Sequence, residues 1–257
     1  MSENNDIYEG GVRAGTACAG LPPILSREYW RAAVLKLWDT RTLVYAALII
    51  ALRIVVKAFR IPIAPGLNIT FDCYINALGS IAYGPVVALL VGAASDTVGA
   101  LLFPSGAYFF PFIIVEMSSG FIFALFLWGR RLSSQRILLA KFTVNFVCNI
   151  IINSAIMKIY YSVLYGSEKS YSFINAARII KNLIMFPLEA MLILIVLGAA
   201  LPLLTRMRLL PHGQERLSLR RRDVAAALLL TLAAVALLLF YIFFLSDWLK
   251  SHNITLF

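Results

Sequence analysis

The sequence predicts an all-α, multi-pass membrane protein, and three observations lead to that prediction. Of the 257 residues, 61% are hydrophobic and 14% are charged, whereas soluble domains are about half apolar and about a quarter charged. Several apolar runs are long enough to cross a hydrocarbon layer of about 30 Å. The 23 Lys and Arg residues outnumber the 13 Asp and Glu residues, and they gather in a few short segments, as they do in cytoplasmic loops of membrane proteins.

Two segments precede the first apolar run. Residues 1–25 begin with an acidic stretch and lack the basic-then-apolar pattern of a cleaved signal. We therefore expect them to remain as a disordered cytoplasmic terminus. Residues 26–41 place Tyr29, Trp30 and Val34 on one helical face, which predicts an interfacial amphipathic helix on the cytoplasmic membrane surface.

Six membrane helices are predicted between residues 42 and 204. Gly84 and Pro85 divide the long apolar run at 71–102 into two shorter helices, because both residues interrupt a helix. The other four helices are single runs, at about 42–56, 112–128, 137–165 and 176–203.

The basic segments set the orientation. Cations follow the fourth and sixth helices, so these loops and the amino terminus all fall on the cytoplasmic side of the plasma membrane. Residues 205–223 form a basic cytoplasmic linker. The almost purely apolar run at 224–245 predicts an extra, seventh membrane helix within the carboxyl-terminal segment 224–257.

The segment from residue 103 to 111 is rich in aromatic residues and helix breakers but has no charge. Irregular backbone at membrane depth persists only where protein buries it or where it lines a cavity. Tyr108, Phe109 and Phe110, with Phe112 just after the segment, can therefore stack on a planar ligand. Alternatively, they form an interfacial aromatic belt.

Charged groups within apolar runs indicate functional sites. Glu116, about one turn into the fourth helix, can accept hydrogen bonds from an amine and a ring N–H of a pterin-like ligand. Alternatively, it forms an ion pair with Lys181, Arg178 or Arg53. Asp72 has the same two interpretations, with solvent exposure as a third.

Two cationic groups lie near the predicted outer ends of helices. Arg178 and Lys181, with Asn182 beside them, begin the sixth helix, and Lys57 and Arg60 end the first. A cation near a ligand carboxylate makes a strong charge-assisted hydrogen bond. The alternative for each is a long side chain that reaches the headgroups or anchors the helix at the interface.

Two amides share one face of the fifth helix. Asn149 and Asn153 are four residues apart, so they can contact a ligand or bond across helices. Asp96, in the third helix, is interpreted as structural or as close to a cytoplasmic partner.

The sequence does not favour an enzyme or a metal site. It has no phosphate-binding Gly-rich loop ending in Gly-Lys-Ser/Thr, so any ATP hydrolysis must come from partners. No catalytic Ser/His/Asp or Cys/His set is apparent, and the Cys and His residues lack metal-ligand spacing. We expect no cofactor, and the distribution of cations does not favour a nucleic-acid partner.

Several motifs, in order along the chain, resemble the folate-family substrate-binding (S) component of energy-coupling-factor (ECF) vitamin transporters. They are the segments 46–56, 69–71, 83–87, 96–109, 165–166 and 178–187. The resemblance implies a six-helix S-component bundle with a pocket open to the outside. It also adds Tyr74 and Ser105, which lie in pocket-forming segments, to the proposed substrate contacts.

The same resemblance implies partners. In that family the first helix docks to a shared transmembrane coupling subunit driven by two ATPase subunits. Ala47 and Ala51 match the small-residue docking motif and lie on one helix face. Alternatively, they only pack the first helix within the bundle.

Departures from the family pattern fall in pocket-forming segments. Phe109-Phe110-Pro111-Phe112 stands where Phe-Pro-Gly-Phe is expected, and Glu116 replaces a small residue. Three functions therefore stay open: a folate- or pterin-binding transport subunit, an S component for another small organic nutrient, and a membrane protein with a structural or regulatory role that does not transport.

Overall fold

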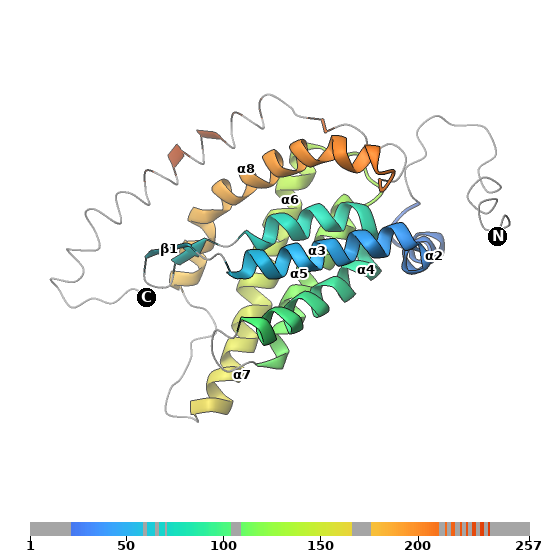
Figure 1. Cartoon of the computed structure of the whole chain (residues 1–257). Coiled ribbons are helices and arrows are strands. Elements are labelled where there is room, and N and C mark those ends of the chain that lie inside the picture. The colour runs from blue at the N-terminus through green and yellow to red at the C-terminus, as the bar shows by residue number, and fades with distance from the viewer. Residues whose placement is uncertain are drawn as a thin grey trace, which may run out of the picture.

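The computed structural model describes residues 22–58, 61–64, 67–69, 71–103, 109–165 and 176–210, and scattered positions between 214 and 236. This part of the chain is a bundle of helices with one small β-hairpin (Figure 1). Most of the amino-terminal segment predicted to be disordered lies outside the described residues.

A helix is present within the predicted segment 26–41, as α2 (Arg27–Leu35) and a 3-10 turn, η1 (Lys36–Trp38), while its position on the membrane surface stays a prediction. Ser26 caps α2, because its hydroxyl accepts a hydrogen bond from the Tyr29 backbone N–H at 3.2 Å. Tyr29 and Ala33 are buried against Trp128, while the Trp38 side chain is 81% exposed. The helix therefore packs on the bundle with one face and leaves apolar groups free on the other.

The first membrane helix, α3 (Thr40–Ala58), begins where Asp39 accepts a hydrogen bond from the Arg41 backbone N–H. After it, β1 (Ile61–Ala64) and β2 (Leu67–Ile69) pair as an antiparallel hairpin. Pro62, in β1, excludes a helix but leaves extended backbone possible, which is compatible with a short hairpin.

Helix α4 (Asp72–Leu102) reverses at Gly84, which has φ 77° and ψ 179°. Asn76, in the first half, and Ala88, in the second half, both lie beside Gly120 of α5, within about 3.5 Å of the position that a Cβ on this glycine would occupy. The two halves of α4 therefore lie next to each other. The prediction of two short helices joined by a tight turn is thus confirmed.

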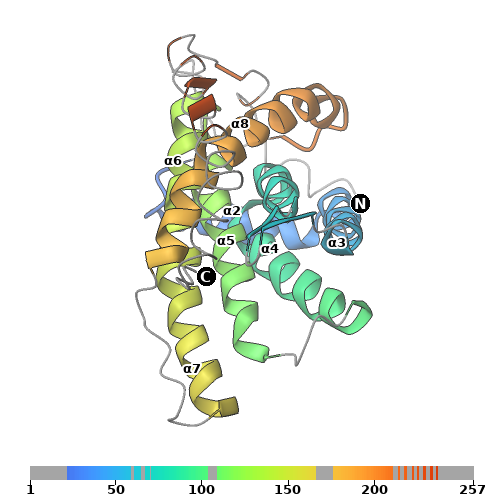
Figure 2. The same cartoon turned by 90° about the vertical axis from the view of Figure 1, so that its left-hand side faces the viewer.

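The remaining helices surround this hairpin. A 3-10 turn, η2 (Phe110–Phe112), leads into α5 (Ile113–Leu127). Next, α6 (Ser134–Val144), the π-helical segment η3 (Asn145–Ile152) and α7 (Asn153–Tyr165) form one continuous rod (Figure 2). Helix α8 (Ala176–Arg206) crosses the top of the bundle in that view. All these boundaries fall within three residues of the predicted ones.

The core lies between α4, α5, α6 and α8, with Tyr74, Phe123, Ile137 and Ile193 among its buried residues. A polar seam joins α4 to α5. The Asn76 amide donates to the Ser119 hydroxyl at 3.1 Å, and the Ser80 hydroxyl lies 3.1 Å from the Gly120 carbonyl oxygen. Such interhelical hydrogen bonds hold helices together where lipid supplies no hydrophobic drive between them.

Within the described residues, four helical stretches are long and apolar enough to cross a membrane: Asp72–Leu102, Phe110–Leu127, Ser134–Val163 and Met185–Arg206. Helix α3 has 19 residues but carries Arg41, Arg53 and Lys57. The predicted seventh helix is described only at scattered, exposed helical positions up to Ala236. The count of six membrane helices plus one stays a prediction.

Part of the basic linker lies against the junction of α5 and α6. The buried Gln214 side chain donates to the backbone carbonyls of Leu127 and Arg130. Ser218 forms an isolated bridge with Ser133. These bonds occupy carbonyl groups that the end of α5 leaves unpaired.

Replacing Gly84 should destabilise the protein. Its dihedral angles fall in a region that is essentially restricted to glycine, and a Cβ there would lie 2.8 Å from Trp128. We expect Gly84→Ala to cost at least about 2 kcal/mol of folding free energy, seen as a lower thermal unfolding midpoint in detergent. In Gly198→Ala the new Cβ would meet its nearest neighbour at 3.7 Å, so this control should match the parent. Equal midpoints for both variants would contradict the assigned turn.

Candidate ligand-binding cavity

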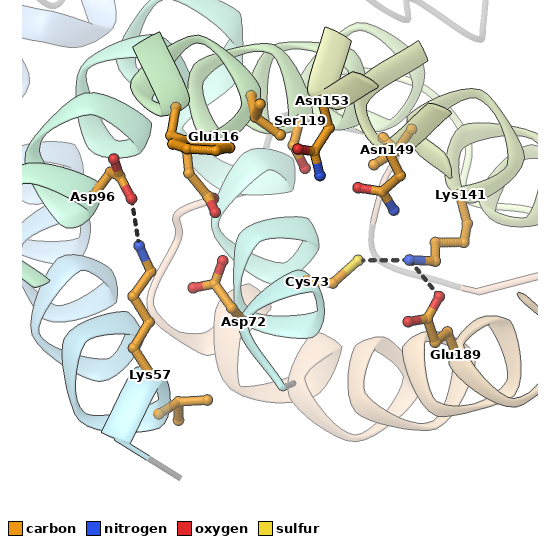
Figure 3. A pocket seen from close by; sticks show the side chains of 14 residues that line it. Lys57, Asp72, Cys73, Asp96, Glu116, Ser119, Lys141, Asn149, Asn153 and Glu189 are labelled. Atoms are coloured by element: carbon orange, nitrogen blue, oxygen red, sulfur yellow. Dashed lines mark hydrogen bonds and ion pairs between the residues drawn. The ribbon is translucent and has the colours of Figure 1, made fainter. Parts of the chain in front are cut away.

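A cavity of about 390 Å³ lies among α3, α4, α5, α8 and the π-helical segment (Figure 3). Charged and amide side chains line most of it, which is unusual inside an apolar bundle. Its lining residues are Val56, Lys57, Asp72, Cys73, Asp96, Phe112, Val115, Glu116, Ser119, Lys141, Val144, Asn149, Asn153 and Glu189.

Arg53 lies behind one wall of the cavity and holds two carboxylates. Its side chain is fully buried, and its guanidinium lies 2.8 and 2.7 Å from the two Asp72 oxygens and 2.5 Å from Glu116 Oε2. The bidentate contact with Asp72 fixes the guanidinium plane. The ion pair that the sequence offered as one interpretation of Glu116 is therefore present, with Arg53 as the partner.

Lys57 forms a second ion pair, with Asp96 at 2.9 Å. The sequence favoured a structural role or a cytoplasmic partner for Asp96 over a place in the pocket. The ion pair is a structural contact between α3 and α4, but Asp96 also lines the cavity, so its exclusion from the pocket is wrong. The reversal at Gly84 causes this placement, since it returns the second half of α4 to the end of the bundle where α3 stops. The other Asp96 oxygen, Oδ2, is buried without a hydrogen-bond partner among the described residues.

A third ion pair closes the opposite wall. Lys141 Nζ lies 2.8 Å from Glu189 Oε2 and 3.2 Å from the Cys73 sulfur, as Figure 3 shows. Lys141 is 2% exposed and lies two turns into α6, inside the run that the sequence predicts as the fifth membrane helix.

Amides line the π-helical wall. Asn149 Nδ2 lies 3.2 Å from both Asn145 Oδ1 and Asn182 Oδ1, while Asn153 Oδ1 is buried without a partner among the described residues. A π-helical insertion widens a helix locally and is frequent at functional sites. Here it presents Asn149 and Asn153 to the cavity, and Asn182 supports Asn149.

The charges at the cavity do not cancel within the described residues. Four carboxylates face three cations: Asp72, Asp96, Glu116 and Glu189 against Arg53, Lys57 and Lys141. Since Arg53 serves both Asp72 and Glu116, the excess negative charge lies at that wall. The wall is suited to a ligand edge that offers hydrogen-bond donors, because a carboxylate only accepts.

The aromatic residues predicted to contact the ligand do not all lie at the cavity. Phe109 packs edge-on against Phe112, which lines the cavity, and against Tyr160. Phe110 is 71% exposed and Tyr74 is buried in the core, and neither lines the cavity. The prediction that these two side chains contact the ligand is not supported by their positions.

Other predicted contacts lie outside the described residues. These are Arg60, Ser105 and Tyr108, and the side chains of Arg178 and Lys181. Their roles stay predictions.

Sequence reasoning did not identify four residues that line or support the cavity. Arg53 was named only as one partner for Glu116, and Lys141, Glu189 and Cys73 were not proposed as cavity residues. The available signal was the opposite charge of Lys141 and Glu189, each placed inside an apolar run. Their proximity depends on how α6 and α8 cross, which no local pattern reveals.

The described residues contain no cluster of His, Cys, Asp or Glu able to hold a metal ion. Cys73 and Cys148 are free thiols. The chemistry of the cavity is therefore that of its ion pairs, amides and aromatic rings.

A helical membrane bundle that encloses a polar cavity is suited to binding a small organic molecule. The family model for the S component of ECF-type riboflavin transporters matches residues 37–208. The chain belongs to this family of transporter S components, and it is a multi-pass membrane protein.

Named relatives agree on the scaffold. The chain is 32% identical over 151 residues to a folate transporter, FolT, of Clostridium novyi, covering 59% of this chain and 84% of that protein. It is 31% identical over 153 residues to the FolT of Leuconostoc mesenteroides, covering 59% and 81%. A crystal structure of FolT bound with folic acid is similar at a TM-score of 0.51 and 28% identity, covering 60% of this chain and 89% of that one.

Removing the Arg53 charge should lower the free energy of unfolding more than breaking an exposed ion pair does. Arg53→Met leaves two carboxylates without their cation, and breaking a buried pair costs about 3–5 kcal/mol. The thermal unfolding midpoint should fall strongly. Lys36→Met, which breaks the partly exposed pair with Asp39, should cost less than about 1 kcal/mol.

The triple variant Arg53→Met, Asp72→Asn, Glu116→Gln tests the cause. It removes the uncompensated charges together with the arginine, so its midpoint should lie above that of Arg53→Met. A triple variant that is less stable than the single one would contradict the electrostatic explanation.

Proposed function

We propose that this chain is the vitamin-binding subunit of an ECF transporter and that its ligand is folate or a related pterin. The choice of ligand rests on one observation: at the wall formed by Arg53, two carboxylates share a single arginine. Glu116 and Asp72 share one cation, and the Glu116 and Asp72 side chains are 25% and 15% exposed to the cavity. They retain capacity to accept hydrogen bonds.

The edge of a pterin ring matches this wall. A pterin offers an exocyclic amine and a ring N–H side by side, which one carboxylate can accept together. The isoalloxazine ring of riboflavin offers one N–H between two carbonyl oxygens, and a carboxylate repels those oxygens. Riboflavin is the second candidate because the matching family model bears its name, but the chemistry of Glu116 favours a pterin.

The rest of the cavity suits the remainder of such a ligand. Phe112 supplies an aromatic face, and Asn149 and Asn153 supply amide donors and acceptors. Lys57, Arg60, Arg178 and Lys181 are proposed to meet the carboxylates of the glutamyl tail. Phe109 supports the aromatic face through Phe112. Tyr108 remains a proposed contact from the aromatic segment, and Ser105 remains one by resemblance.

A proposed partner surface lies on α3. Ala47 and Ala51 are exposed on the outer side of this helix, which disfavours the alternative that they only pack it within the bundle. Small side chains allow a second helix to approach closely. We propose that this face binds a shared transmembrane coupling subunit, with two ATPase subunits supplying energy and the amino terminus in the cytoplasm.

Ligand binding to the purified chain tests the function. Folate should co-purify with the protein and be identified by mass spectrometry, and added folate should compete with it while riboflavin does not. Selective retention of riboflavin would favour the second candidate. A reproducibly empty cavity would favour the structural or regulatory role.

Glu116→Gln tests the contact itself. The amide presents only one acceptor oxygen and no charge, so we expect folate affinity to fall about tenfold to a hundredfold, since hydrogen bonds to charged groups contribute about 1.5–3 kcal/mol. Glu28→Gln, on the exposed face of α2, is the matched control and should bind as the parent does. Unchanged affinity in Glu116→Gln would remove this residue from the site.

The docking face predicts a separation of binding from transport. Ala51→Trp should keep folate affinity but abolish ATP-dependent uptake in cells that contain the coupling module, because the indole blocks close helix approach. Ile195→Trp, on the exposed side of α8, should transport normally. Full uptake by the Ala51→Trp variant would exclude this face as the docking site.

A further inference from the structure

A second hollow lies at the opposite, basic end of the bundle. This arginine groove has a volume of about 430 Å³ and is formed by the segment before α2, the end of α5 and the start of α6. It is lined by Ile24, Leu125, Phe126, Arg130, Ser133, Gln135, Arg136 and Leu139. No part of it belongs to the ligand-binding cavity.

Among the described residues that line the groove, two are arginines and none is acidic. Arg130 and Arg136 are half-buried, and neither forms a salt bridge with any described residue. Arg130 Nη2 donates to the Pro22 carbonyl oxygen at 3.2 Å, and Arg136 Nη1 lies 3.5 Å from the Arg131 carbonyl oxygen. These contacts orient the guanidinium groups, and no carboxylate in the described part of the chain neutralises their charges.

Neighbouring groups keep the groove positive. Burial raises the pKa of Tyr29 to about 12 despite the nearby Arg130, so its phenol stays neutral. The amino-terminal end of α6, capped by Ser133, adds the positive end of a helix dipole. An anion would be held by both arginines.

The groove lies at the level where hydrocarbon gives way to headgroups. The membrane-crossing stretch of α5 ends at Leu127 and the next one begins at Ser134, so Arg130 and Ser133 fall between the two. The apolar side chains of Leu125, Phe126 and Leu139 also line the groove.

An apolar track leads away from the groove along the rod of α6 and η3. Leu139, Phe142 and Phe146 are about half exposed, and the rings of Phe142 and Phe146 stack with centroids 6.4 Å apart. At 1.5 Å rise per residue this track is about 10 Å long, which is enough to hold the upper part of an acyl chain.

We propose that the arginine groove binds one anionic phospholipid, with its phosphate between Arg130 and Arg136 and an acyl chain along Leu139, Phe142 and Phe146. Basic pockets at the ends of membrane helices are suited to lipid phosphates. An overall negative headgroup, such as that of phosphatidylglycerol, is favoured over phosphatidylcholine because the choline cation is repelled by the same arginines.

Native mass spectrometry tests the site. The full-length protein is purified in detergent with equimolar phosphatidylglycerol and phosphatidylcholine, and retained lipid is measured. One phosphatidylglycerol should be retained in preference, and Arg130→Gln with Arg136→Gln should reduce its retention about tenfold or more. The control Arg27→Gln with Arg31→Gln, which removes two exposed cations from α2, should retain the lipid.

Leu139→Trp keeps both arginines and fills the apolar part of the groove, so it should also reduce the retention of phosphatidylglycerol. This variant tests the proposal if the arginine variant does not fold. Equal loss in the α2 control would show general attraction to anionic lipid, and equal retention of both lipids would show no headgroup choice. Displacement of the lipid by excess glycerol 3-phosphate would show a site for phosphate alone. Each of these three results, or full retention by the groove variants, would overturn the proposal.

Discussion

The burial of Arg53 between two carboxylates is the constraint on which the rest of the structure depends. An arginine cannot lose its proton inside a protein, so its complete burial in α3 requires anions within hydrogen-bond distance. Asp72 comes from the start of α4 and Glu116 from the start of α5. Three helices are thereby fixed relative to one another at one end of the bundle.

This arrangement also defines the ligand site. The reversal of α4 at Gly84 brings Asp96 back beside Lys57, and the crossing of α6 and α8 brings Lys141 to Glu189. Within each pair the attraction between the two charges offsets part of their desolvation, so a polar cavity persists inside an apolar bundle. Because one cation serves two carboxylates, the cavity keeps an acceptor-rich wall that a fully paired site would lack.

Charged side chains have different partners at the two ends of the bundle. At the cavity end, cations are buried and paired with carboxylates from other helices. At the other end, Arg130 and Arg136 are half-buried beside apolar side chains and have backbone partners. The first pattern selects a ligand that complements fixed charges, and the second suits the anionic surface of a membrane.

The sequence by itself determined the class, the helix boundaries and the break in α4, because hydrophobic run length and Gly-Pro interruptions are local signals. Its motifs also indicated the S-component family, and Glu116 stood out as a charge inside an apolar run. Only the tertiary structure decided that Arg53 pairs with Glu116, that Lys141 is buried, that Asp96 lines the cavity and that Tyr74 does not. Those outcomes depend on how helices distant in sequence cross and rotate, and the one-dimensional pattern does not contain that information.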